Sequence, residues 1–181
     1  MNSRIILLVL ATLVLAPAAF ADQSSMPYAG QQTRTIKALS DDEIAALLNG
    51  EGMGFAKAAE LNGYPGPAHV LTLAQQLKLT DKQRQQVQAI FDRMSATAKP
   101  LGAELVERER VLDQLFAKSE ITPNQLAAET AAIAELQGRL RCAHLAAHLD
   151  TRALLSVDQI ALYQQLRGYA SPAAPMHHHH G

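Results

Sequence analysis

The chain has 181 residues, a length typical of one domain. It is 48% hydrophobic, 4% aromatic and 18% charged, with no Trp and one Cys, which excludes a disulfide-rich, a collagenous or a highly charged disordered chain. Lys and Arg number 16 against 17 Asp and Glu, so there is no basic excess. We therefore expect no nucleic-acid binding through phosphate neutralisation.

Residues 1–21 have the pattern of a cleavable signal peptide. Arg4 provides the positive end, the stretch 5–15 is apolar except for Thr12, and the small-x-small sequence at 19–21 predicts cleavage before Asp22. The apolar run is too short for a comfortable transmembrane helix, so we favour cleavage over a retained anchor and expect no membrane insertion. The A-x-A cleavage pattern is typical of bacterial export, which predicts a periplasmic protein.

Cys142 has no possible partner within the chain. In an oxidising compartment such a residue is a buried thiol, an intermolecular cross-link or a reactive thiol. We favour the buried thiol.

After a polar, aperiodic stretch at residues 22–39, interpreted as a flexible arm, the mature chain is predicted to form short helices. A capping box at Ser40 begins the first, which ends at Asn49. A second is expected over residues 53–61. Pro67 suits the first position of a third, which apolar spacing extends to residue 78.

Two long helices follow. The first covers residues 81–118 and contains Pro100, which is expected to bend it. Its apolar residues recur in steps of three and four, interrupted once at Arg108, as in a coiled-coil seam: Val87, Phe91, Met94, Ala98, Leu101, Leu105, Leu112 and Leu115. The second begins at a capping box on Thr122 and runs to about residue 154. A connection of about four residues makes the two helices antiparallel neighbours.

A last helix is expected from Ser156 to Arg167, and no apolar alternation predicts a strand. The predicted fold is all-α: an elongated, bent antiparallel hairpin with shorter flanking helices over residues 40–169. Val106, Val111 and Phe116 lie off the main seam, where a two-helix hairpin leaves apolar surface uncovered. We therefore expect a cradle-like homodimer.

Two similar motifs begin the first long helix and the last helix. Their residues are Leu79, Thr80 and Gln83 in one and Leu155, Ser156 and Gln159 in the other. In each motif the hydroxyl accepts from a backbone N–H and the glutamine reaches back to the cap, so we interpret all six as structural helix caps.

Two LTxxQ elements flanking a helical hairpin, in an exported chain of this size, resemble the Spy/CpxP family of periplasmic stress proteins. That family includes the ZraP- and CnrX-like heavy-metal resistance proteins. The resemblance covers roughly residues 64–169, and Ser156 stands where the family usually has Thr. Some members place His ligands on bundle helices, which favours a metal site here.

His144 and His148 are spaced i, i+4, so both imidazoles lie on one face of the second long helix. Neutral imidazole is a ligand for Zn, Cu, Ni or Co. Cys142 lies about 200° around the helix from His144 and is not expected to bind the same ion.

The register of the hairpin predicts that His69 lies at a similar height to His144 and His148. Antiparallel packing places the capped breaks at Thr80 and Ser156 at one end, and all three histidines lie eight to twelve residues before a break. A site of His69, His144 and His148 follows if the helix of His69 packs back along the hairpin. Met94 is a conceivable fourth ligand, although a core role is the simpler interpretation. The alternative is two half-exposed helix histidines and an unrelated third.

Residues 170–181 are predicted to be a flexible Pro/Ala linker and a metal-binding tail. The tail consists of His177, His178, His179 and His180. A purification tag is the competing interpretation, but the retained signal peptide favours a native tail.

There is no phosphate loop, no nucleophile elbow and no His placed to activate Cys142, so we expect no enzyme. The charge run at residues 107–110 is interpreted as a solvated helix face. The predicted function is a periplasmic transition-metal-binding stress protein that acts in metal sensing, buffering or resistance. The resemblance implies an alternative, an ATP-independent holdase chaperone for unfolded envelope proteins. A third interpretation is an adaptor that docks onto a membrane-bound sensor.

Overall fold

The computed structural model describes residues 26–169. The predicted signal peptide, the Pro/Ala linker and the histidine tail lie outside the described residues. The chain divides into two compact units, one ending at Gln32 and one beginning at Thr33. In the first, the Gln31 side-chain amide donates to the Pro27 carbonyl at 3.1 Å, beside the 3-10 turn Gln31–Thr33.

The second unit contains all the α-helices of the described residues. They are α1 (Asp41–Asn49), α2 (Lys57–Glu60), α3 (Pro67–Thr72), α4 (Asp81–Ala117), α5 (Pro123–Leu154) and α6 (Val157–Leu166). Within residues 26–169 the only β-type pairing is an isolated bridge between Ile36 and Leu39. The all-α prediction is confirmed. No helix of this part of the chain is long and apolar enough to cross a membrane.

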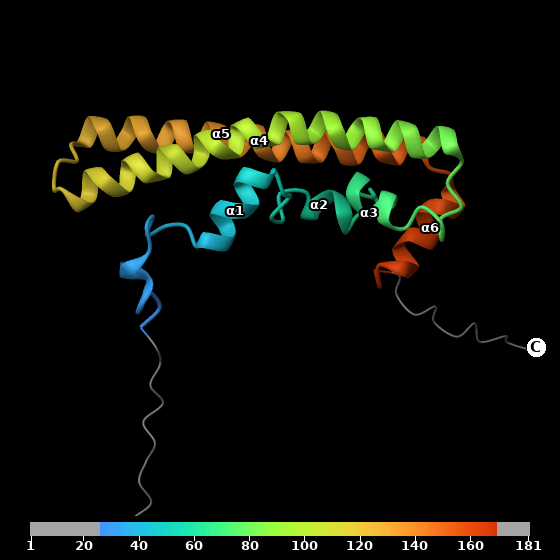
Figure 1. Ribbon diagram of the computed structural model, residues 1–181, viewed down its shortest axis with the longest axis horizontal. Helices are drawn as coiled ribbons and strands as arrows, with labels where there is room; N and C mark the ends of the chain where they lie inside the picture. Colours follow the sequence, from blue (N-terminus) through green and yellow to red (C-terminus); the bar gives the residue numbers. More distant parts are fainter. Residues whose placement is uncertain (1–25, 170–181) are drawn as a thin grey trace, which may run out of the picture. The chain divides into compact units, whose positions relative to one another are not determined.

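The long helices α4 and α5 lie side by side as an antiparallel hairpin, and α4 continues through Pro100 (Figure 1). The short helices α1, α2 and α3 follow one another along one side of this hairpin. Helix α6 leaves the end of α5 after the break at Ser156. The hairpin is therefore the scaffold against which α1, α2 and α3 pack.

The two glutamines of the LTxxQ motifs interlock. Each capping box is formed, so each glutamine oxygen accepts from its own cap residue. In addition, Gln83 Nε2 donates to the Leu154 carbonyl and to Gln159 Oε1, both at 2.9 Å. Gln159 Nε2 donates to the Leu77 carbonyl at 3.1 Å and to Gln83 Oε1 at 3.2 Å. The two capped breaks therefore meet at one end of the hairpin, as the register predicted.

Two of the short helices are shorter than predicted. Helix α2 begins only at Lys57 because Met53 and Gly54 have φ values of 41° and 84°, in the left-handed region that a helix cannot include. Helix α3 ends at Thr72, and the following turns end at Lys78 with φ 50°. The predicted length of α3 was based on the spacing of its apolar residues. Consecutive turns can repeat apolar residues at a similar spacing without forming an α-helix.

Part of the expected N-terminal arm is packed against α4. Ile36 is buried, with 2% of its surface exposed. The Asp113 carboxylate accepts hydrogen bonds from the backbone N–H and the Nζ of Lys37, each at 3.0 Å. Leu39 also packs, partly buried, against the apolar cluster of the hairpin, so this end of the expected arm is attached to the hairpin by at least one apolar contact and one ion pair.

The buried apolar residues form two clusters along the hairpin. One lies toward the α4–α5 connection and consists of Leu47, Ala98, Leu101, Leu105, Ile133, Leu136 and Leu140. The other lies toward the capped breaks and consists of Val70, Ala74, Leu77, Leu79, Val87, Leu155 and Tyr163. On α5, the stretch between Leu140 and Leu155 contains the buried His144 and His148. A layer with histidines therefore separates the two apolar clusters.

Helix α1 approaches α4 very closely. A Cβ atom added at Gly102 would lie 2.1 Å from the Leu47 carbonyl oxygen, so only glycine permits this contact. Val106, one of the residues expected off the seam, packs partly buried against the same cluster. Less apolar surface is left uncovered on α4 than the spacing suggested.

Candidate metal site

A pocket of about 250 Å³ lies between α3, α4, α5 and the loop that follows α1. His144 and His148 reach it from α5, His69 from α3, and Met94 from α4. Three predicted histidines and the candidate thioether therefore line one space. The hairpin register brings them there from positions up to 79 residues apart in the sequence (148 minus 69).

His144 is the most buried of these candidate ligands, with 3% of its surface exposed. Its Nε2 atom has no hydrogen-bond partner among the described residues. The ring stacks on Phe55, with the centroids 6.0 Å apart and 13° between the planes. Burial, with a smaller contribution from His148, lowers the pKa of His144 below its usual value. The ring is therefore neutral near pH 7.

His148 is held in a defined tautomer. Its Nδ1 lies 2.7 Å from the Tyr64 carbonyl, and a carbonyl can only accept, so Nδ1 carries the proton. An imidazole in this tautomer has its lone pair on Nε2, the arrangement by which proteins orient metal-binding histidines. A Cβ atom at Gly66 would lie 2.9 Å from this Nε2, so the loop can rest against the ring only with glycine there.

Glu60 connects the pocket with α6. Its side chain is 11% exposed, and Oε1 accepts from the Tyr163 hydroxyl at 2.5 Å. Oε2 accepts from the Gly66 N–H at 3.3 Å and lies 3.7 Å from His148 Nδ1. Arg167 Nε donates to Oε1 at 3.4 Å and balances the buried charge. The carboxylate therefore ties α2, the loop at Gly66 and α6 together.

His69 is tied to this carboxylate network and is 48% exposed. Its Nδ1 lies 3.5 Å from Glu60 Oε1 and 3.4 Å from the Tyr163 hydroxyl. Burial, followed by the nearby Arg167 guanidinium, lowers the pKa of His69. Burial and the hydrogen bond to Glu60 raise the pKa of Tyr163 well above its usual value. The phenol therefore stays protonated and donates to Glu60.

The pocket offers donor atoms without a closed coordination shell. Among residues 26–169, no group of three or more His, Cys, Asp or Glu side chains is arranged to hold a metal ion. The chemistry of the donors nevertheless suits a transition metal, since His144 Nε2 is buried without a partner and Met94 adds a soft sulfur. His69 would have to leave Glu60 and Tyr163 to use its Nδ1 for an ion.

Comparison with protein families gives a match to the heavy-metal resistance family over residues 6–161. The chain belongs to this family. The family covers the Spy/CpxP/ZraP-like helical proteins that the LTxxQ motifs resemble, so that resemblance is confirmed, and its members are typically exported. No curated protein and no solved structure matches the chain.

In this member of the heavy-metal resistance family, the prediction of a buried Cys142 is wrong. The thiol is free and exposed. The reason is the angle that separates it from the pocket: two helical residues span about 200°, so Cys142 faces outward when His144 faces inward.

Sequence reasoning missed the residues that support the histidines. Glu60, Tyr64, Gly66 and Tyr163 touch the imidazoles or each other but belong to no metal-ligand pattern. The dense run of Gly and Pro at residues 63–67 is the one available signal, because such a run marks a backbone that passes close to another element.

Proposed function

We propose that this protein binds a transition metal in the periplasm and acts in metal sensing, buffering or resistance. The site is the pocket of His144, His148 and His69, with Met94 beside it. The observation that carries the proposal is the buried, unpartnered His144 Nε2. An unsatisfied buried polar atom costs about 1–3 kcal/mol of stability, and a metal ion would remove that cost.

The remaining parts of the proposal rest on the sequence and on family membership. The signal-peptide pattern at residues 1–21 and the typical export of the family support a periplasmic location. The four histidines at 177–180 would supply a second binding segment. A homodimer and docking onto an envelope sensor are further expectations of the same proposal.

Titration of the mature protein with Zn, Cu, Ni and Co tests the pocket directly. The protein should carry Ser at residues 177–180, so that the tail does not contribute. We expect one ion per chain for at least one of these metals. His144→Leu and His148→Asn should each weaken binding by about tenfold or more. Asn at 148 preserves a side-chain N–H for the Tyr64 carbonyl and removes the Nε2 lone pair.

The control variant is Gln125→Glu, which lies at the α5 cap, away from the pocket. Its affinity for metal should equal that of the parent protein. Binding that disappears with the tail histidines and ignores His144 would place the ion on the tail and contradict the pocket. Absence of binding by the full-length protein would end the proposal.

A holdase activity is the second candidate function. Phe116 and Leu126, 54% and 40% exposed, flank the α4–α5 connection and favour contact with apolar clients. The assay is suppression of aggregation of a denatured client at equimolar protein, with metal chelated. No suppression under those conditions would contradict this candidate.

A further inference from the structure

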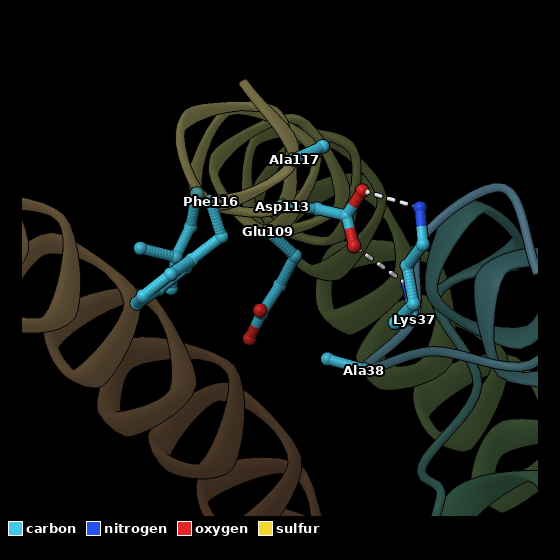
Figure 2. A pocket seen from close by; sticks show the side chains of 7 residues that line it. Lys37, Ala38, Glu109, Asp113, Phe116 and Ala117 are labelled. Atoms are coloured by element: carbon cyan, nitrogen blue, oxygen red, sulfur yellow. Dashed lines mark hydrogen bonds and ion pairs between the residues drawn. The ribbon is translucent and has the colours of Figure 1, made fainter. Parts of the chain in front are cut away.

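A second pocket, of about 490 Å³, lies far along α4 from the histidines. It is formed by the last turns of α4 and by residues 37–38 (Figure 2). Its walls are mainly apolar, with Leu112, Phe116 and Ala117 on the helix and Ala38 opposite. Pockets of about 300–1,000 Å³ with apolar walls and few polar groups are typical of small-molecule sites.

The charged side chains that line this pocket leave a net negative charge. Lys37 and Asp113 form an ion pair, with Nζ 3.0 Å from Oδ2. Glu109 points into the space between Phe116 and Ala38 (Figure 2) and has no ion-pair or hydrogen-bond partner among the described residues. The pocket thus carries one uncompensated negative charge.

The arginines beside Glu109 are engaged elsewhere. Arg108 Nη1 lies 3.5 Å from Glu129 Oε2 on α5, and Arg110 Nε donates to Glu107 at 2.8 Å. The charge run at 107–110, expected to be a solvated face, therefore divides into two ion pairs and one carboxylate left in the pocket. Glu109 is half-buried, and this loss of hydration raises the pKa of its carboxyl above the usual value.

We propose that this pocket binds a small organic cation with an apolar body, an amine or a guanidine. Its charged group would contact the Glu109 carboxylate, and its body would lie against Leu112 and Phe116. A charge-assisted hydrogen bond to a carboxylate is stronger than a neutral one, and an aromatic ring adds attraction for a cation.

Other occupants fit the pocket less well. A neutral apolar molecule would cover Glu109 without supplying a partner, and an anion would be repelled by it. A second copy of the chain could cover Phe116, but it would have to present a cationic side chain to Glu109 as well. The charge complementarity therefore points to a cationic ligand.

Benzylammonium is a suitable probe, because it combines a primary ammonium group with an aromatic ring. Binding to the mature protein can be followed by the NMR shifts of Ala38 and Phe116. Benzyl alcohol, its neutral analogue, should bind about tenfold more weakly. Glu109→Gln should weaken benzylammonium binding by about tenfold, and Phe116→Leu by about threefold.

The matched control is Glu104→Gln, an exposed carboxylate on the same helix, which should leave benzylammonium binding unchanged. Thermal unfolding of each variant checks that the fold is intact. The metal affinity of Glu109→Gln should equal that of the parent, because the pockets share no lining residue.

Four results of the binding measurements would overturn the proposal. They are no binding of benzylammonium, equal binding of benzyl alcohol, insensitivity to Glu109→Gln, and tighter binding of a lysine-containing apolar peptide than of the free amine. The last would assign the pocket to a protein partner. Self-association of the mature protein, measured by sedimentation and weakened by Phe116→Leu, would likewise make the surface an interface between copies.

Discussion

His144 combines deep burial with an unsatisfied nitrogen, which lowers the stability of the metal-free protein. Replacing it with Leu keeps a side chain of similar volume and removes the unpartnered atom. We expect His144→Leu to leave the free energy of unfolding unchanged or to raise it by about 1 kcal/mol, while metal binding is lost. Urea unfolding in the presence of a chelator measures this. A loss of stability of more than about 1 kcal/mol would mean that the packing of the imidazole stabilises the fold.

The same residue makes stability depend on pH. The pKa of His144 is lower in the folded protein than in the unfolded chain, so the unfolded chain binds more protons between the two values. With respect to His144, the free energy of unfolding is therefore at its full value above about pH 6.5. It falls as the pH drops from there toward the pKa of the folded state. His69, also with a lowered pKa, adds a smaller effect because it is half-exposed. Unfolding midpoints of the chelated protein from pH 8 to about pH 5 should fall, and those of His144→Leu should fall less. Equal pH profiles would contradict this assignment.

The glutamines of the LTxxQ motifs have a second role beyond capping. Glutamate can also close a capping box, but it has no Nε2 to donate to the glutamine of the other motif or to the Leu154 or Leu77 carbonyl beside that motif. We expect Gln83→Glu and Gln159→Glu each to lower the free energy of unfolding by about 1–3 kcal/mol. Chemical denaturation measures this.

Gln125 provides the matched control for these changes. It closes the box of Thr122 through its oxygen, and among residues 26–169 no hydrogen bond links it to another helix. Gln125→Glu should change stability by less than about 0.5 kcal/mol. Equal effects at all three positions would mean that the motif only caps.

The contact between α1 and α4 depends on Gly102. A methyl group there collides with the backbone of α1, so Gly102→Ala should lower stability by about 1–3 kcal/mol even though alanine favours helix. The control is Gly138→Ala on α5, where a Cβ atom meets nothing within 4 Å and stability should rise by about 1 kcal/mol. Thermal unfolding compares the two. A stabilising Gly102→Ala would show that α1 is not seated on α4.

Elements determined by nearby residues could be predicted from the sequence. The capped starts of α1, α4, α5 and α6 depend on residues three apart, and the predicted starts match the structure. The extents of α2 and α3 could not be predicted, because the left-handed turns at Met53 and Lys78 depend on how the loops pack. The close approach at Gly102 could not be predicted either, since a glycine inside a helix does not indicate which other element packs against it.

At the scale of the whole molecule, the hairpin register determines which distant residues meet. It brought His69, His144 and His148 to one pocket, which the sequence predicted from their distances to the two caps. The register could not reveal that Glu60 and Tyr163 contact His69, or that Glu109 has no ion-pair or hydrogen-bond partner among the described residues, because those contacts depend on side-chain directions. The two apolar clusters support the fold, and the buried His144 and His148 lie between them on α5.

The most direct test of metal binding at this layer is the ¹⁵N NMR spectrum of the imidazoles. The mature protein with Ser at residues 177–180 should be recorded before and after one equivalent of the tightest-binding metal. We expect the Nε2 resonances of His144 and His148 to move to metal-bound positions while Nδ1 of His148 keeps its proton. Unchanged Nε2 resonances of His144 and His148 at saturating metal would contradict a metal site in the hairpin.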